Sequence, residues 1–244
     1  MLRQPLVVIM GNIDAGKTKI LDTLRRTAIA ESEPGAITQM ISSSSISIKT
    51  IQRICGDLLK NKKIDLPGIV FIDTPGHAAF SNMRKRGGNL ADIAILIIDI
   101  NEGIKPQTEE CITILKKYKT PFIIALNKID KITGWRDTKS PFLLNMLAEQ
   151  SPEVQTAIET KLYEIVGKCF ELGFQANRFD RIDDYTKTVA MIPCSAKQSF
   201  GLPELLMVLL GLAQKYLEKD LDTNEQAPAK ATILEVQEEQ GLGT

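Results

Sequence analysis

The sequence predicts an α/β fold with a mostly parallel central sheet and helices on both of its faces. Short, continuously apolar runs alternate with stretches of helical periodicity, and such runs are typical of parallel strands that are buried on both faces. The regular alternation of strand and helix favours βαβ units. The expected strands are residues 6–10, 69–72, 93–98, 122–126 and, more weakly, 189–192.

Three later helices follow from spacing and punctuation. Apolar residues at helical spacing predict helices over 108–118 and 202–217. A third helix is expected over 152–170, because Pro152 lies at its start and Gly173 follows its end.

Two regions do not fit the simple alternation. Ser42–Lys49 begins with consecutive serines and then alternates isoleucine with serine, which indicates a loop that leads into an edge strand. Residues 131–185 are polar and helical, and we interpret them as an insertion.

The chain end suggests a second domain. We expect residues 1–218 to form one nucleotide-binding domain and 219–230, which are charged and contain Pro228, to be a linker. Residues 231–244 include a strand pattern without a visible partner, so we expect them to begin a second domain that is cut short.

The composition is that of an ordinary globular chain, with 43% hydrophobic and 25% charged residues. Lys+Arg and Asp+Glu both number 30, so net charge gives no argument for autonomous nucleic-acid binding. The four cysteines form no CxxC pair, and we expect buried, reduced thiols in a cytoplasmic protein. No apolar run reaches membrane-spanning length, so no membrane association is expected.

The segment Gly11–Thr18 matches the pattern GxxxxGKS/T, in which backbone N–H groups cradle phosphates at a helix N-terminus. It follows the first expected strand and opens a helical pattern over 17–26, which is the context the motif requires. Lys17 can reach the β- and γ-phosphates, and the Thr18 hydroxyl can bind Mg²⁺. The expected nucleotide contacts here are Asn12, Ile13, Asp14, Ala15, Gly16, Lys17 and Thr18.

A second phosphate element follows the strand at 69–72. Asp73 is placed to bind the Mg²⁺ shell, and Gly76 has an N–H that can approach a γ-phosphate without a side chain in the way. His77 is the single histidine in the chain. A lone histidine is more often structural, but its place directly after Gly76 favours a role in positioning the attacking water.

The segment Asn127–Asp130, which reads NKID, indicates guanine. The Asp130 carboxylate can accept from N1–H and the 2-amino group of guanine, donors that adenine lacks. Asn127 is expected to brace the base region, and the aliphatic part of Lys128 can cover the face of the base. Ser195, Ala196 and Lys197 fit a loop in which a backbone N–H meets the guanine O6.

Taken together, these motifs resemble the signatures of the translational GTPases. Within them the chain is most similar to the initiation factor five B group, the archaeal and eukaryotic counterpart of bacterial initiation factor two. The supporting stretches are 82–88, 99–103, 106–108, 134–136, 232–236 and 241–243. The resemblance implies a P-loop GTPase domain whose tail enters a β-barrel.

The resemblance also assigns roles that the residues alone do not. Thr38 would be the switch threonine, which binds Mg²⁺ and senses the γ-phosphate, so the implied catalytic residues are Lys17, Thr38 and His77. Ile13 and Ile37 would flank the approach to His77. Asp14 would help to hold a monovalent cation, K⁺ or Na⁺, beside GTP or GDP.

The implied partner is the factor-binding region of the large ribosomal subunit. Initiator tRNA would be contacted only by domains that are absent here, and the chain would act as a monomer. Asn12, Ala15 and Lys19 depart from the usual phosphate loop, as do Ala36 and Met40 in the first switch. Two alternatives stay open: another translational GTPase, such as an elongation factor, and a nucleotide-gated binding module without significant turnover.

Overall fold

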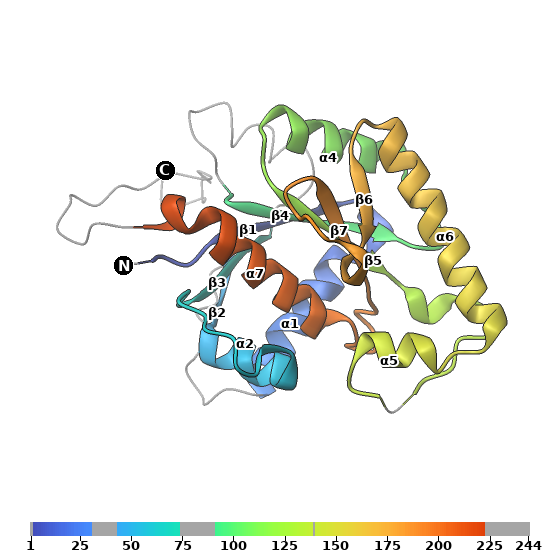
Figure 1. The fold of residues 1–244 in the computed structure, drawn as a ribbon, viewed down its shortest axis with the longest axis horizontal. Helices are drawn as coiled ribbons and strands as arrows, with labels where there is room; N and C mark the ends of the chain where they lie inside the picture. The colour runs from blue at the N-terminus through green and yellow to red at the C-terminus, as the bar shows by residue number, and fades with distance from the viewer. Residues whose placement is uncertain (1, 31–42, 74–90, 139, 223–244) are drawn as a thin grey trace, which may run out of the picture.

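A seven-stranded sheet runs through the computed structural model, which describes residues 2–30, 43–73, 91–138 and 140–222 (Figure 1). Its strand order is β2-β3-β1-β4-β5-β7-β6. All neighbouring strands are parallel except β2, which pairs with β3 in the antiparallel sense. The strands are β1 Leu6–Gly11, β2 Ser43–Ser47, β3 Gly68–Asp73, β4 Ile93–Asp99, β5 Phe122–Asn127, β6 Gln175–Arg178 and β7 Thr188–Pro193.

Helices cover both faces of this sheet, as the sequence predicts. On one side α1, α2 and α7 pack together, and on the other α4 lies along β1 and β4 while α6 lies along β6 (Figure 1). The α-helices are α1 Lys17–Ala30, α2 Ile48–Cys55, α4 Pro106–Lys117, α5 Leu143–Ala148, α6 Pro152–Glu171 and α7 Leu202–Leu221. Short 3₁₀ turns are η1 Ile13–Ala15, η2 Gly56–Leu59, η3 Ile129–Lys131 and η4 Phe179–Arg181.

The core explains why the central strands are continuously apolar. Every residue of β4 is buried, and in β1 and β5 only the first residue is partly exposed. Because helices cover both faces, no strand face in this central part can be polar without losing the solvation of its side chains. The five expected strands are therefore confirmed, each within one or two residues of its predicted ends.

Three features differ from the predictions. Ser43–Ser47 form the expected edge strand β2, but Ser43–Ser45, which the serine run placed in a loop, already lie in the strand. The chain then turns into α2 at Ile48, because the Ser47 hydroxyl caps this helix by accepting from the N–H of Thr50. Residues 131–185 also contribute β6 to the main sheet, so this region belongs to the α/β layers.

Helix α7 continues past the predicted end at Leu217 to Leu221, so the first residues expected in the linker are helical. The start of the chain lies beside the end of this helix, since the N–H of Arg3 donates to the carbonyl of Leu221 at 2.9 Å. The expected strand at 231–236 lies outside the described residues. Within the described helices, none is long and apolar enough to cross a membrane.

Candidate functional site

The phosphate loop connects β1 to α1 at the point where the strand order reverses, with β3 on one side of β1 and β4 on the other. Open α/β sheets bind ligands at such a switch point, outside the carboxyl ends of the strands. Gly11 and Gly16 both have positive φ, +143° and +95°. A Cβ on Gly11 would lie 2.3 Å from the carbonyl oxygen of Ile97, so a side chain at this position would collide with β4.

Lys17 is the first residue of α1, and its side chain folds back over the loop. Its Nζ donates to the carbonyl oxygens of Gly11 at 2.9 Å and Asn12 at 2.8 Å. The ammonium group therefore lies at the mouth of the loop, where it can neutralise a phosphate. Thr18, on the same first turn, is exposed and its hydroxyl can reach a metal ion there.

Asn12, the unusual residue of this loop, has a structural role in the local turn. Its Oδ1 accepts from the N–H of Ile13 at 2.8 Å and its carbonyl accepts from the N–H of Ala15 at 3.2 Å. The Oε1 of Gln107 also accepts from the N–H of Ile13 at 3.3 Å. Gln107 lies in the first turn of α4, so this helix helps to fix the loop, a contact that the sequence motif does not reveal.

Asn127 joins the phosphate loop to the base-recognition loops. Its side chain is buried, and its Nδ2 donates to the carbonyl of Ala15 at 2.8 Å while its Oδ1 accepts from the N–H of Ala196 at 3.0 Å. From α1, the hydroxyl of Thr23 donates to the carbonyl of Ala196 at 2.7 Å. The three motif loops predicted from sequence are thus bound to one another, and Asn127 braces them as expected.

Ser195 and Lys197 complete the loop after β7. Ser195 is fully buried, its N–H donates to the carbonyl of Phe200 at 3.0 Å, and its Oγ accepts from the N–H of Gln198 at 3.2 Å. These bonds close the 195–200 turn. Lys197 is exposed on it.

Asp130 lies in η3, half-buried, directly after Lys128 and Ile129. The N–H of Ile129 donates to the carbonyl of Cys194 at 3.3 Å, which holds η3 against the end of β7. Burial, and secondarily the negative charge of Asp130, raises the pKa of the Cys194 thiol well above its usual range. Cys194 therefore stays a neutral packing residue beside the base loop.

Lys128 has a left-handed backbone, with a φ of 65°. Its Nζ lies 2.9 Å from Oδ2 of Asp99, the last residue of β4. Asp99 and Asn127 are register partners in the β4–β5 pair, so the two strands end side by side at this edge.

The expected metal and γ-phosphate residues lie at or beyond the boundary of the described chain. Asp73 is described by its backbone alone: it ends β3 and is the register partner of Ile9, close to where β1 enters the phosphate loop. Thr38, Gly76 and His77 lie outside the described residues. Asp14, in η1, is exposed, and Ile13 beside it is 75% exposed.

All four cysteines are buried and free, as predicted. Burial raises the pKa of Cys55, Cys111 and Cys169 to about 12, so these thiols are not nucleophiles at neutral pH.

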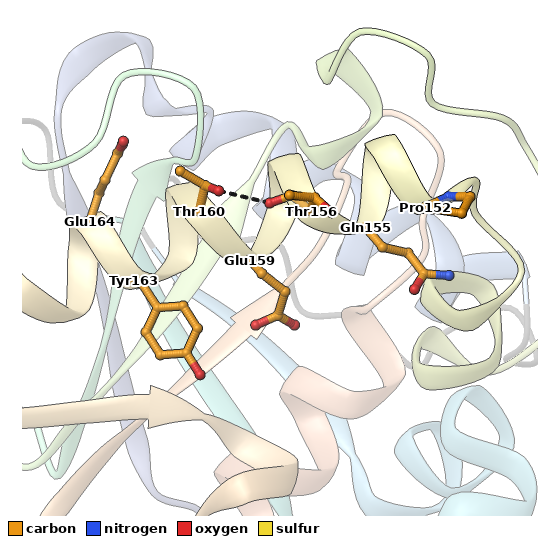
Figure 2. Close-up of a pocket in the computed structure, with 7 residues that line it drawn as sticks. All are labelled: Pro152, Gln155, Thr156, Glu159, Thr160, Tyr163 and Glu164. Atoms are coloured by element: carbon orange, nitrogen blue, oxygen red, sulfur yellow. Dashed lines mark hydrogen bonds between the residues drawn. The ribbon is translucent and has the colours of Figure 1, made fainter.

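A shallow surface hollow of about 760 Å³ lies apart from these loops, along α6. Figure 2 shows that all of its lining side chains come from this one helix, with Glu159 and Tyr163 pointing to the same side. The Thr160 hydroxyl donates to the carbonyl of Thr156 at 2.9 Å, one turn earlier. No charged group is enclosed there, so the nucleotide loops remain the candidate functional site.

A phosphate loop at the switch point of a parallel sheet, bound through Asn127 to an NKxD loop, defines a guanine-nucleotide-binding P-loop domain. Comparison with known families agrees: the profile described as "Elongation factor Tu GTP binding domain" matches residues 3–215. The chain therefore belongs to the elongation factor Tu GTP-binding domain family.

The similar proteins are archaeal initiation factors. The "Probable translation initiation factor IF-2" of Thermococcus sibiricus is 54% identical over 246 residues, covering 100% of this chain and 41% of its own length. That of Methanopyrus kandleri is 52% identical, covering 99% and 41%. The chain thus spans about two fifths of these curated relatives.

Among solved structures, GDP-bound aIF5B from Aeropyrum pernix is 48% identical with a TM-score of 0.92, covering 100% of this chain and 41% of that one. The elongation factor SelB from Methanococcus maripaludis shares the fold alone, at 22% identity and a TM-score of 0.51, with 87% and 34% covered.

Proposed function

We propose that this chain is the GTP-binding and GTP-hydrolysing domain of a translation initiation factor of the aIF5B and archaeal IF-2 kind. The observation that carries the proposal is the pair of hydrogen bonds by which Asn127 joins Ala15 of the phosphate loop to Ala196. This link fixes the distance between a phosphate site and a guanine site, so one ligand that contains both groups can occupy them together.

Mg²⁺ would be held by the Thr18 hydroxyl and Asp73, with Thr38 joining them in the GTP state. The donor set fits, because hydroxyl and carboxylate oxygens are the ligands that Mg²⁺ prefers. The glycine cradle fits the phosphates, since a Cβ at Gly11 or Gly16 would fill it. When bound, the ion supplies charge neutralisation of the phosphate oxygens.

Hydrolysis would depend on His77 and Gly76. His77 would position the attacking water, and Gly76 would donate its N–H to the γ-phosphate. Segments 35–45 and 76–88 would become ordered around the γ-phosphate and be released after its loss. We assign no arginine that stabilises the transition state in cis, so unassisted turnover should be slow, and the ribosome would complete the site by fixing His77.

The finer assignments are parts of the same proposal. Asp14 would help to hold K⁺ or Na⁺ beside the phosphates, and Ile13 with Ile37 would flank His77. The partner would be the factor-binding region of the large ribosomal subunit, approached by a monomer in the cytoplasm. Initiator tRNA would be contacted by other domains. We further propose that residues 1–218 form the GTPase domain, 219–230 a linker, and 231–244 the start of a β-barrel domain.

Identity to the archaeal IF-2 and aIF5B proteins is about half, compared with 22% for SelB, which favours the initiation factors over an elongation factor. A binding module without turnover is tested by experiment. GTP hydrolysis by the purified chain is measured with Mg²⁺ and K⁺, with and without ribosomes, for the wild type and His77→Ala.

Slow turnover that ribosomes accelerate in the wild type, and not in His77→Ala, is the expected result, with equal GTP affinity in both. Tight GTP and GDP binding without any turnover would favour the binding module. Persistent stimulation in His77→Ala would overturn the role given to His77.

A further inference from the structure

Asp99 makes an ion pair with the lysine of the base-recognition motif. Its Oδ2 lies 2.9 Å from the Nζ of Lys128, and the side chains are only 8% and 21% exposed. Ion pairs this far from solvent are little screened by salt and hold their geometry better than surface pairs.

Asn101 ties the same two residues together from the other side. The Oδ1 of Asp99 accepts from the backbone N–H of Asn101 at 2.9 Å and from its Nδ2 at 3.2 Å. The same Nδ2 donates to the carbonyl oxygen of Lys128 at 3.0 Å. Both the backbone and the side chain of Lys128 are therefore held by the turn that follows β4.

The arrangement is anchored in the sheet. Asp99 is the register partner of Asn127, and the N–H of Ile100 donates to the Asn127 carbonyl at 3.0 Å. The carbonyl of Asp99 accepts from the N–H groups of Glu102 at 3.1 Å and Gly103 at 2.9 Å, which closes the turn. A rigid turn at the end of a buried strand thus presents the carboxylate to Lys128.

Lys128 needs such support for two reasons. Its left-handed backbone is unfavourable for a residue with a Cβ, and its long side chain has many rotamers to lose. An anchor for Nζ fixes the aliphatic part of the side chain, which is the part that would lie against a base.

We infer that Asp99 is a positioning residue of the guanine site, which acts through Lys128 and is supported by Asn101. The inference rests on the proposed guanine-nucleotide function and deepens it. Asp99 prearranges Lys128 as one wall of the base pocket, so a bound nucleotide leaves more slowly.

The test is the dissociation rate of a fluorescent GDP analogue, measured by stopped-flow displacement with excess GDP and Mg²⁺. Asp99→Asn keeps the size of the side chain and the oxygen that faces Asn101, and removes the charge that faces Lys128. Loss of one charge-assisted hydrogen bond predicts dissociation about five- to tenfold faster. Asn101→Ala should act in the same direction with a smaller effect.

The matched control is Asp92→Asn, at the opposite end of the same strand. Asp92 pairs with Arg3 at 2.7 Å and accepts from the N–H of Leu6 at 2.7 Å, so its loss also removes a partly buried charge next to β4. It should lower thermal stability and leave the GDP dissociation rate unchanged.

A double-mutant cycle separates positioning from general destabilisation. If Asp99 acts through Lys128, then Asp99→Asn should not accelerate dissociation further in a Lys128→Met background. Additive effects would overturn the inference. So would an unchanged or slower rate in Asp99→Asn, since a slower rate means that the ion pair must break when nucleotide binds. Failure of the wild type to bind GDP at all would instead overturn the proposed function.

Discussion

The side-chain amide of Asn127 lies directly beneath Gly16 of the phosphate loop, so that a Cβ on Gly16 would be 2.4 Å from its Nδ2. The loop can adopt its path over Asn127 only because this residue has no side chain and accepts a φ of +95°. The base-recognition motif and the phosphate motif are therefore fitted to each other sterically as well as through hydrogen bonds.

Gly16→Ala should damage both stability and nucleotide binding. The left-handed backbone and the contact with Asn127 predict a loss of about 1–3 kcal/mol in the free energy of unfolding. Urea denaturation measures this loss, and GDP titration should show weaker binding. Gly167→Ala is the control: this exposed glycine of α6 has nothing within 4 Å of a built Cβ, so alanine should stabilise the helix by about 0.5–1 kcal/mol. Equal effects of the two substitutions would contradict the packing described here.

Asn127→Ala should leave two buried backbone groups, the Ala15 carbonyl and the Ala196 N–H, without their partner. We expect the free energy of unfolding to fall by about 2–4 kcal/mol. The loops should also separate, so GDP affinity should fall beyond what stability alone explains. Asn145→Ala, on the exposed face of α5, should change neither quantity in the same calorimetric measurements. An unchanged GDP affinity in folded Asn127→Ala would show that the loops are held by other contacts.

Lys17 and Lys19 form a natural pair for testing the phosphate site. Lys17 lies over the loop, whereas Lys19 is exposed on the first turn of α1. Lys17→Ala should weaken GDP binding by about 100-fold, as expected for the removal of a charge partner from a phosphate. Lys19→Ala should have little effect on isothermal titration. A comparable loss in both variants would mean that general positive charge, and not the placement of Lys17, binds the phosphates.

Glu204 should make the protein less stable as pH rises. Burial raises the pKa of this carboxyl, whose Oε1 accepts from the N–H of Leu143 at 2.7 Å. The folded state therefore prefers the protonated form. Its contribution is fully present below the unfolded pKa and is lost as pH rises through the raised folded pKa.

Glu204→Gln keeps the acceptor for Leu143 and removes the charge. The difference in melting temperature between Glu204→Gln and the wild type should grow in favour of the variant from pH 4 to pH 8. Glu164→Gln, on exposed α6, should show no such trend. A difference that stays constant with pH would contradict the burial of a neutral carboxyl at Glu204.

Much of the fold follows from sequence because buried parallel strands must be apolar. β6 was not predicted because Gln175–Arg178 is polar, which an edge strand tolerates. α2 was read as part of a strand because a short alternation of isoleucine and serine fits either periodicity. The motif loops were predicted by their order, whereas the contacts of Gln107 and Asp99 depend on strand register and helix placement, which short patterns do not encode.

The central claim is that Asp130 selects guanine at a site shared with the Gly11–Thr18 loop. Its most direct test is a titration of wild type and Asp130→Asn with GDP, ADP and xanthosine diphosphate. Xanthine carries a carbonyl oxygen where guanine carries its 2-amino group, so an amide at this position pairs better with it. We predict that the wild type binds GDP and excludes ADP, and that Asp130→Asn prefers xanthosine diphosphate. Equal binding of GDP and ADP by the wild type, or an unchanged preference in the variant, would contradict the account.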